Sequence, residues 1–126
     1  MNAAYSDQYQ KVQIETASKA DLLLLTYEGT VRAMIRAARA CKMGNQSKAR
    51  MEILNGMAGV IELMGTLNFE VGGDLATSLQ SLYLYVLERL RSAVISLDPA
   101  PLEESRHIMS SLLQTWRKAL GVSNAA

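Results

Sequence analysis

Apolar residues recur along this chain at alternating steps of three and four, the spacing that puts side chains on one face of an α-helix. The first stripe predicts a helix over residues 19–43, with its buried face formed by Leu24, Tyr27, Val31, Met34, Ala38 and Cys41. Ser18 is a favourable N-cap for this helix, and Gly44-Asn45 is a typical helix end.

Three further stripes predict three more helices. The second covers about residues 47–68, and the third begins at the cap Asp74 and runs to about Leu97 with Leu75 and Tyr83 on its buried stripe. The fourth follows Asp98-Pro99-Ala100-Pro101, because proline fits a first helical turn. Short connections between long helices imply antiparallel neighbours, so we predict an all-α, antiparallel up-down-up-down four-helix bundle.

The ends of the chain lack such a stripe. We predict one helical-bundle domain over residues 1–126, with a partly mobile N-terminal arm at 1–15, the bundle at 16–121 and a frayed tail at 122–126. The second predicted helix also carries Gly56, Gly59 and Gly65, each costing about 1 kcal/mol relative to alanine. Tight packing inside the bundle and close approach of a ligand peptide both explain them.

The composition narrows the classes of partner. Thirteen basic and 12 acidic residues give a net charge of +1, which argues against nucleic acid as the main partner. Cys41 is the only cysteine, so no internal disulfide forms, and without a recognisable signal peptide we expect a cytosolic protein. The longest apolar run, Leu22 to Leu25, is too short for membrane insertion.

We find no pattern that indicates catalysis. Glu104 and His107 form one Glu-x-x-His motif, but a di-metal four-helix enzyme needs two, and His107 is the only histidine. The Val71-Gly72-Gly73-Asp74 segment lacks the lysine of a phosphate-binding P-loop. We therefore predict no enzyme, no catalytic or metal-binding residue and no cofactor.

Several apolar residues exceed what one buried stripe requires, and these are the candidate partner-binding residues. They are Tyr5, Tyr9, Val12, Ile14, Leu22, Leu25, Met57, Met64, Leu84 and Tyr85. Methionine adapts to varied binding partners, although a methionine at helical spacing also fits a core. The tyrosines of the arm, alternatively, cover an apolar groove that a partner would otherwise fill.

The order of short motifs resembles the FliS family of flagellin-specific export chaperones over nearly the whole chain. The resemblance rests on Thr16-Ala17-Ser18, Leu22-Leu23, Tyr27-Glu28-Gly29, Gly72-Gly73, Leu75-Ala76, Leu79, Leu82-Tyr83, Tyr85, Leu90, Ala93, Leu112-Leu113 and Trp116. Lys19, Thr26 and Leu84 depart from the family pattern.

This resemblance implies a cytosolic chaperone that binds the C-terminal helical segment of flagellin, blocks premature polymerisation and keeps the subunit competent for flagellar type III secretion. It also implies contact with the export gate, carried here onto Tyr5 and Tyr9. A homodimer is left open. The alternative function is a homo-oligomeric structural bundle without flagellin binding, followed by the di-metal enzyme.

Overall fold

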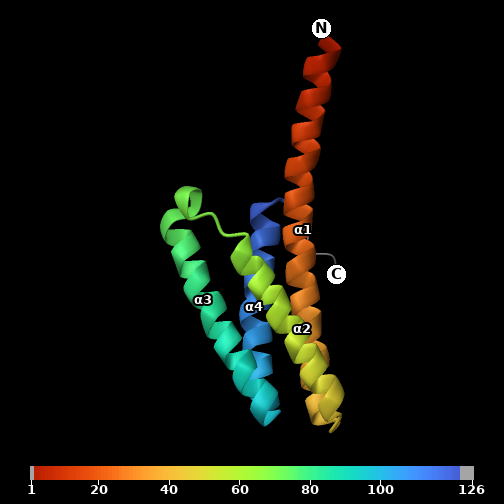
Figure 1. Cartoon of the computed structure of the whole chain (residues 1–126), viewed down its shortest axis with the longest axis vertical. Helices are drawn as coiled ribbons and strands as arrows, with labels where there is room; N and C mark the ends of the chain where they lie inside the picture. Colours follow the sequence, from red (N-terminus) through yellow and green to blue (C-terminus); the bar gives the residue numbers. More distant parts are fainter. Residues whose placement is uncertain (1, 123–126) are drawn as a thin grey trace.

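The computed structural model describes the backbone of residues 2–122 and the side chains of residues 19–122. Within these residues the chain forms four helices, shown in Figure 1: α1 (Asn2–Lys42), α2 (Gln46–Gly65), α3 (Phe69–Ser96) and α4 (Pro99–Ala119). The connections between them are two or three residues long, so consecutive helices run antiparallel.

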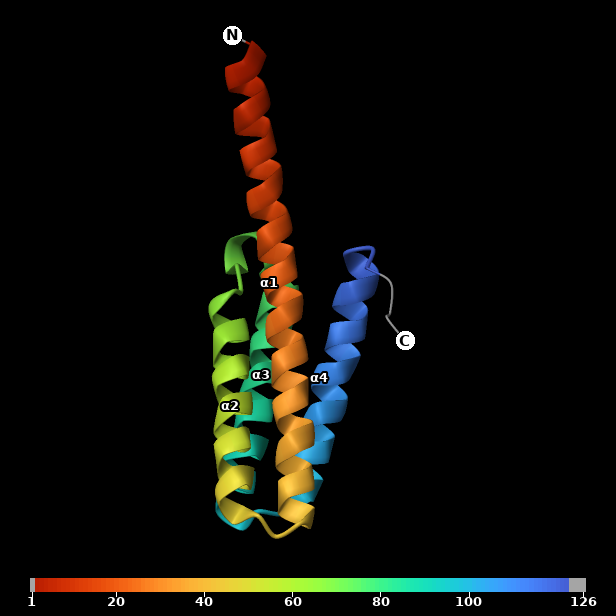
Figure 2. The ribbon, with the colours of Figure 1, turned by 90° about the vertical axis from the view of Figure 1, so that its right-hand side faces the viewer.

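The four helices form a ring of neighbours. α1 contacts α2 and α4, and α3 contacts the same two helices, so α1 and α3 lie diagonally across the bundle. Figures 1 and 2 show the up-down-up-down order, with the α1–α2 and α3–α4 connections at one end of the bundle. The predicted all-α, antiparallel four-helix bundle is therefore confirmed.

The predicted start of the first helix is wrong. α1 does not begin at Lys19 behind a Ser18 cap, because it is one continuous helix of 41 residues from Asn2. No proline or glycine occurs between Asn2 and Glu28, so nothing in this segment breaks a helix. Figure 2 shows the first turns of α1 extending past the end of the other three helices, where an irregular arm was expected. The mobility of this segment stays a prediction.

α3 also begins earlier than predicted, at Phe69 and not after Asp74. The side chain of Asn68 caps it by accepting hydrogen bonds from the amides of Glu70 and Val71, each at 3.1 Å. Gly73, with φ 49° and ψ −123°, interrupts the helical geometry just before Asp74. Glycine adopts a positive φ at little cost, so the predicted turn is a kink within α3.

The core contains the central part of every predicted stripe. Tyr27, Met34, Val86 and Met109 are among its fully buried members. Leu75 is a correction: it was predicted to be buried but is 61% exposed. Leu75 follows the Gly73 kink by two residues, and Figure 1 shows the start of α3 leaning away from α4.

Candidate partner-binding surface

A cavity of about 530 Å³ opens at the end of the bundle from which α1 projects. It lies between α1, the last turns of α2 and α4, and the middle of α3. We call it the open-end cavity, and its lining consists of Lys19, Ala20, Leu22, Leu23, Thr26, Glu62, Thr66, Tyr83, Trp116 and Leu120. Most of these side chains are apolar or aromatic, so the cavity suits apolar side chains of a bound segment.

Three aromatic side chains from three helices are joined by hydrogen bonds, and two of them, Tyr83 and Trp116, line this cavity. Trp116 donates its indole N–H to the Tyr27 hydroxyl at 3.0 Å, and the Tyr27 and Tyr83 hydroxyls share a hydrogen bond. The two tyrosine rings lie 6.5 Å apart between centroids. Burial raises the pKa of both Tyr27 and Tyr83, so both stay neutral over the physiological pH range.

Two candidate residues of α1 have described side chains, Leu22 and Leu25. Leu22 lines it and is 57% exposed, and Leu25, one turn further on, is 59% exposed. Neither side chain belongs to the buried core. These two leucines therefore present apolar surface next to the open end of the bundle.

The candidate methionines of α2 lie deeper than the leucines. Met57 and Met64 are half-buried and pack against the core, as the core interpretation of their spacing expected. The more exposed apolar residues of α2 are Met51, Leu54 and Ile61, each more than half exposed. Sequence reasoning did not single out Leu54 and Ile61 as binding residues. Their seven-residue spacing, which repeats a second apolar face on α2, was the available signal.

Leu84 and Tyr85 lie on α3 directly after Tyr83 but differ from it in burial. Tyr83 is buried, as predicted, whereas Leu84 and Tyr85 are about half exposed. The Tyr85 hydroxyl donates to the carboxylate of Glu104 on α4, and the same carboxylate oxygen lies 3.3 Å from Nε of Arg89. Tyr85 is thus held against α4 by a polar contact, while about half of its surface remains exposed.

The structure does not gather all candidate residues into one site. Leu22 lines the open-end cavity, whereas Leu84 and Tyr85 are exposed on α3. The side chains of Tyr5, Tyr9, Val12 and Ile14 lie outside the described residues. Exposed apolar side chains spread over three helices fit an extended partner better than a compact ligand.

No group of three potential metal ligands occurs among the described side chains. None of the helices, as far as the structure describes them, has the length and apolar character needed to cross a membrane. The four-helix fold, the open-end cavity and the uncovered apolar residues of α2 together define a helical-bundle interaction protein.

The family model described as "Flagellar protein FliS" matches residues 1–123, and the chain belongs to this family. It is similar to the flagellar secretion chaperone FliS of Salmonella typhimurium, with 29% identity over 87% of this chain and 85% of that protein. The FliS of Campylobacter jejuni is 29% identical, over 93% of the length of this chain and 91% of the length of that protein. The FliS of Bacillus subtilis is 26% identical, over 89% of the length of this chain and 83% of the length of that protein.

The family confirms the resemblance inferred from the short motifs. It is a family of secretion chaperones and not of enzymes, so the prediction of a non-enzymatic protein is also confirmed. The flagellar and secretion-related character of the protein follows from the same family membership.

Proposed function

We propose that this protein is a cytosolic export chaperone that binds the C-terminal helical segment of flagellin. Binding would cover the apolar residues through which flagellin subunits associate, which prevents premature polymerisation and keeps the subunit competent for flagellar type III secretion. Membership of a secretion chaperone family supports the general role. The observation that carries the finer proposal is the uncovered apolar surface of α1 and α2 beside the open-end cavity.

The distribution of that surface favours a partner that wraps around the bundle. Ordering a disordered segment on binding costs about 2–5 kcal/mol, so a short contact gives little net affinity. Leu22, Leu54 and Ile61 are each more than half exposed and lie on two neighbouring helices. An amphipathic segment that forms helices against several such faces buries enough apolar area to offset its ordering cost.

Co-expression with the flagellin C-terminal segment, followed by size-exclusion chromatography with light scattering, tests this proposal. We expect a stoichiometric complex with one copy of each chain. Ile61→Asp should weaken it at least about tenfold, since it puts a charge on a surface that binding desolvates. Ile95→Asp is the matched control, because Ile95 is 73% exposed on α3 and lies away from the open-end cavity. Self-association without flagellin binding would instead support the homo-oligomeric bundle.

The N-terminal segment is the second part of the proposal. We assign Tyr5 and Tyr9 to contact with the export gate, and Tyr5, Tyr9, Val12 and Ile14 to reversible covering of the flagellin-binding surface. Deleting residues 1–15 should leave the bundle folded, because among the side chains that the structure describes, residues 19–122, the buried core already draws on all four helices. If the deletion changed neither the affinity for flagellin nor the aggregation of the free protein, the covering role would be wrong.

A further inference from the structure

A second apolar depression lies on the other side of α1, where α1 meets α4. Two cavities open along this contact. The larger, of about 400 Å³, has an apolar floor made by Met34, Ile35, Ala38 and Leu102. The smaller, of about 320 Å³, adds Val31 and Leu113 one turn further along. We call the two cavities together the α1–α4 seam.

The rim of the seam is strongly cationic. Five basic side chains and two acidic ones line the two cavities, which leaves an excess of three positive charges. The whole chain has a net charge of only +1, so the remainder of the protein is net acidic and the positive charge is concentrated here. A cationic rim of this kind attracts acidic partners and repels basic ones.

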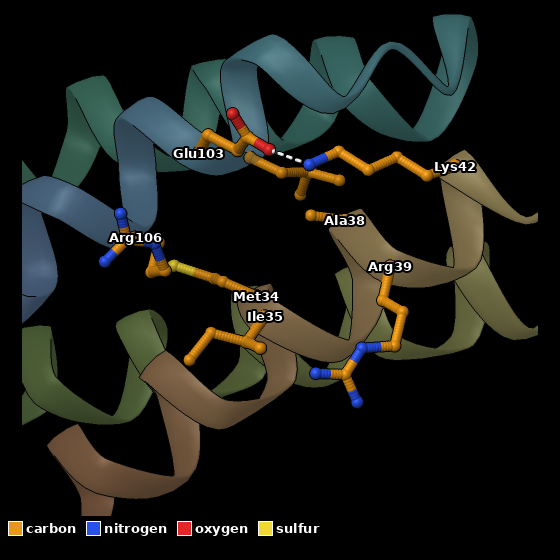
Figure 3. Close-up of a pocket in the computed structure, with 8 residues that line it drawn as sticks. Met34, Ile35, Ala38, Arg39, Lys42, Glu103 and Arg106 are labelled. Atoms are coloured by element: carbon orange, nitrogen blue, oxygen red, sulfur yellow. Dashed lines mark hydrogen bonds and ion pairs between the residues drawn. The ribbon is translucent and has the colours of Figure 1, made fainter.

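The acidic residues of the seam are already occupied. Glu103 of α4 pairs with Lys42 of α1 at 2.5 Å, the contact drawn in Figure 3, and Glu28 pairs with Arg117 at 2.8 Å. The hydrogen bond and charge of Lys42 lower the pKa of Glu103, with a smaller contribution from Arg106. Arg32, Arg39 and Arg106 form no salt bridge among the described side chains.

The dimensions of the seam fit a helix. Glu28 and Lys42 mark its length on α1, and the rise over these 14 steps of α-helix is about 21 Å. That length matches about four turns of a partner helix, which would place apolar residues at i, i+3 or i+4, and i+7 over the floor. Ile35, 38% exposed, is the floor residue that projects furthest toward solvent.

We propose that the α1–α4 seam is a docking surface for an acidic amphipathic helix of a partner protein. The apolar stripe of the partner packs on Ile35 and the floor beneath it. Its flanking carboxylates face Arg32, Arg39 and Arg106. This surface lies on α1 and α4 and shares no lining residue with the open-end cavity, so it is separate from the surface proposed for flagellin.

A synthetic helical peptide tests the docking surface in the full-length protein. The probe is a fluorescein-labelled 18-residue peptide with leucines on one face and glutamates beside them, and binding is measured by fluorescence anisotropy. One comparison peptide has lysines in place of the glutamates, and a second has the acidic sequence scrambled so that no apolar face remains. We expect the lysine peptide not to bind, and the scrambled peptide to bind at least about tenfold more weakly than the acidic amphipathic peptide.

Charge reversals locate the binding site. Arg106→Glu should weaken the acidic peptide at least about threefold, and Arg39→Glu combined with Arg106→Glu at least about tenfold. Lys118→Glu makes the same change in net charge elsewhere on α4 and should leave the affinity within about twofold. Ile35→Ser should also weaken binding, with Ile95→Ser on α3 as its control.

Three results would overturn the proposal. Equal loss of binding in Arg106→Glu and Lys118→Glu would show a long-range effect of net charge. Equal binding of the scrambled peptide would show that the apolar floor is not used. Tighter binding of a 20-nucleotide single-stranded DNA than of the acidic peptide, lost on Arg106→Glu, would assign the seam to nucleic acid. Where Arg106→Glu does not fold, Arg106→Gln and Arg39→Glu make the same test.

Discussion

Thr30 of α1 packs tightly against Gly59 of α2, and replacement of this glycine by alanine tests the packing in detail. A Cβ atom at this position would lie 2.0 Å from Oγ1 of Thr30 and 3.1 Å from its Cβ. Thr30 is buried, and its hydroxyl donates a 2.7 Å hydrogen bond to the carbonyl of Thr26. The hydroxyl therefore cannot rotate away without losing that bond.

The magnitude of the effect follows from this geometry. An ordinary contact begins at 3.4 Å, so Thr30 and the new methyl group must move apart from 2.0 Å by about 1.4 Å. Overpacking in a well-packed core costs about 1–3 kcal/mol, and alanine offsets at most about 1 kcal/mol through its helix propensity. Since the displaced hydroxyl is also hydrogen-bonded, we expect a net loss of about 2 kcal/mol.

Urea unfolding followed by circular dichroism measures this loss, with an expected decrease of about 1 M in the midpoint. Gly56→Ala is the matched control in the same helix, because its Cβ would meet only ordinary contacts, the nearest 3.6 Å away at Cγ of Met34. It should leave the stability unchanged or raise it. Thr30→Ala combined with Gly59→Ala should recover most of the loss. The reasoning fails if Gly59→Ala alone is as stable as Gly56→Ala.

Three further predictions concern contacts between helices. Tyr27→Phe should lower the free energy of unfolding by about 1–3 kcal/mol, more than Tyr83→Phe, because Tyr27 bonds both Tyr83 and Trp116; thermal melts of the two variants compare them. Because the folded state raises the pKa of both tyrosines, their contribution is complete below the ordinary value of about 10 and is lost as pH rises above it. The melting temperature should therefore fall above pH 10, and less so in the double phenylalanine variant. Arg117→Met should destabilise the bundle by about 1 kcal/mol by leaving half-buried Glu28 unpaired, and 1 M NaCl should reduce the difference between the variant and the wild type.

The interior of each helix follows from the sequence, because the periodicity of apolar residues within a helix is a local property. The stripe from Leu24 to Ala38 and the burial of Tyr83 are both confirmed. The positions at which helices begin depend less on the local sequence. Ser18 and Asp74 are good caps in isolation, yet α1 continues through Ser18 and α3 begins at the cap of Asn68. A favourable cap stabilises a helix start but does not prevent a helix from continuing through it.

The candidate surface depends more on tertiary structure than the fold does. Leu54 and Ile61 have the same apolar character as buried Ile53 and Val60, and only the positions of the neighbouring helices decide which pair is covered. The tertiary structure also explains one of the glycines of α2. Gly59 leaves room for the side chain of Thr30 of α1, so this glycine serves packing inside the bundle. A Cβ atom at Gly65 would have no neighbour within 4 Å.

The sequence by itself determined the number of helices, their antiparallel order and the family, since these depend on local periodicity, short connections and motif order. The tertiary structure decided which apolar residues stay uncovered and which charges remain unpaired. Glu28 pairs with Arg117 of α4, and Arg32, one turn after Glu28 on α1, forms no salt bridge among the described side chains. Residues 89 positions apart meet only when the helices pack, so no local pattern could have predicted the cationic seam between α1 and α4.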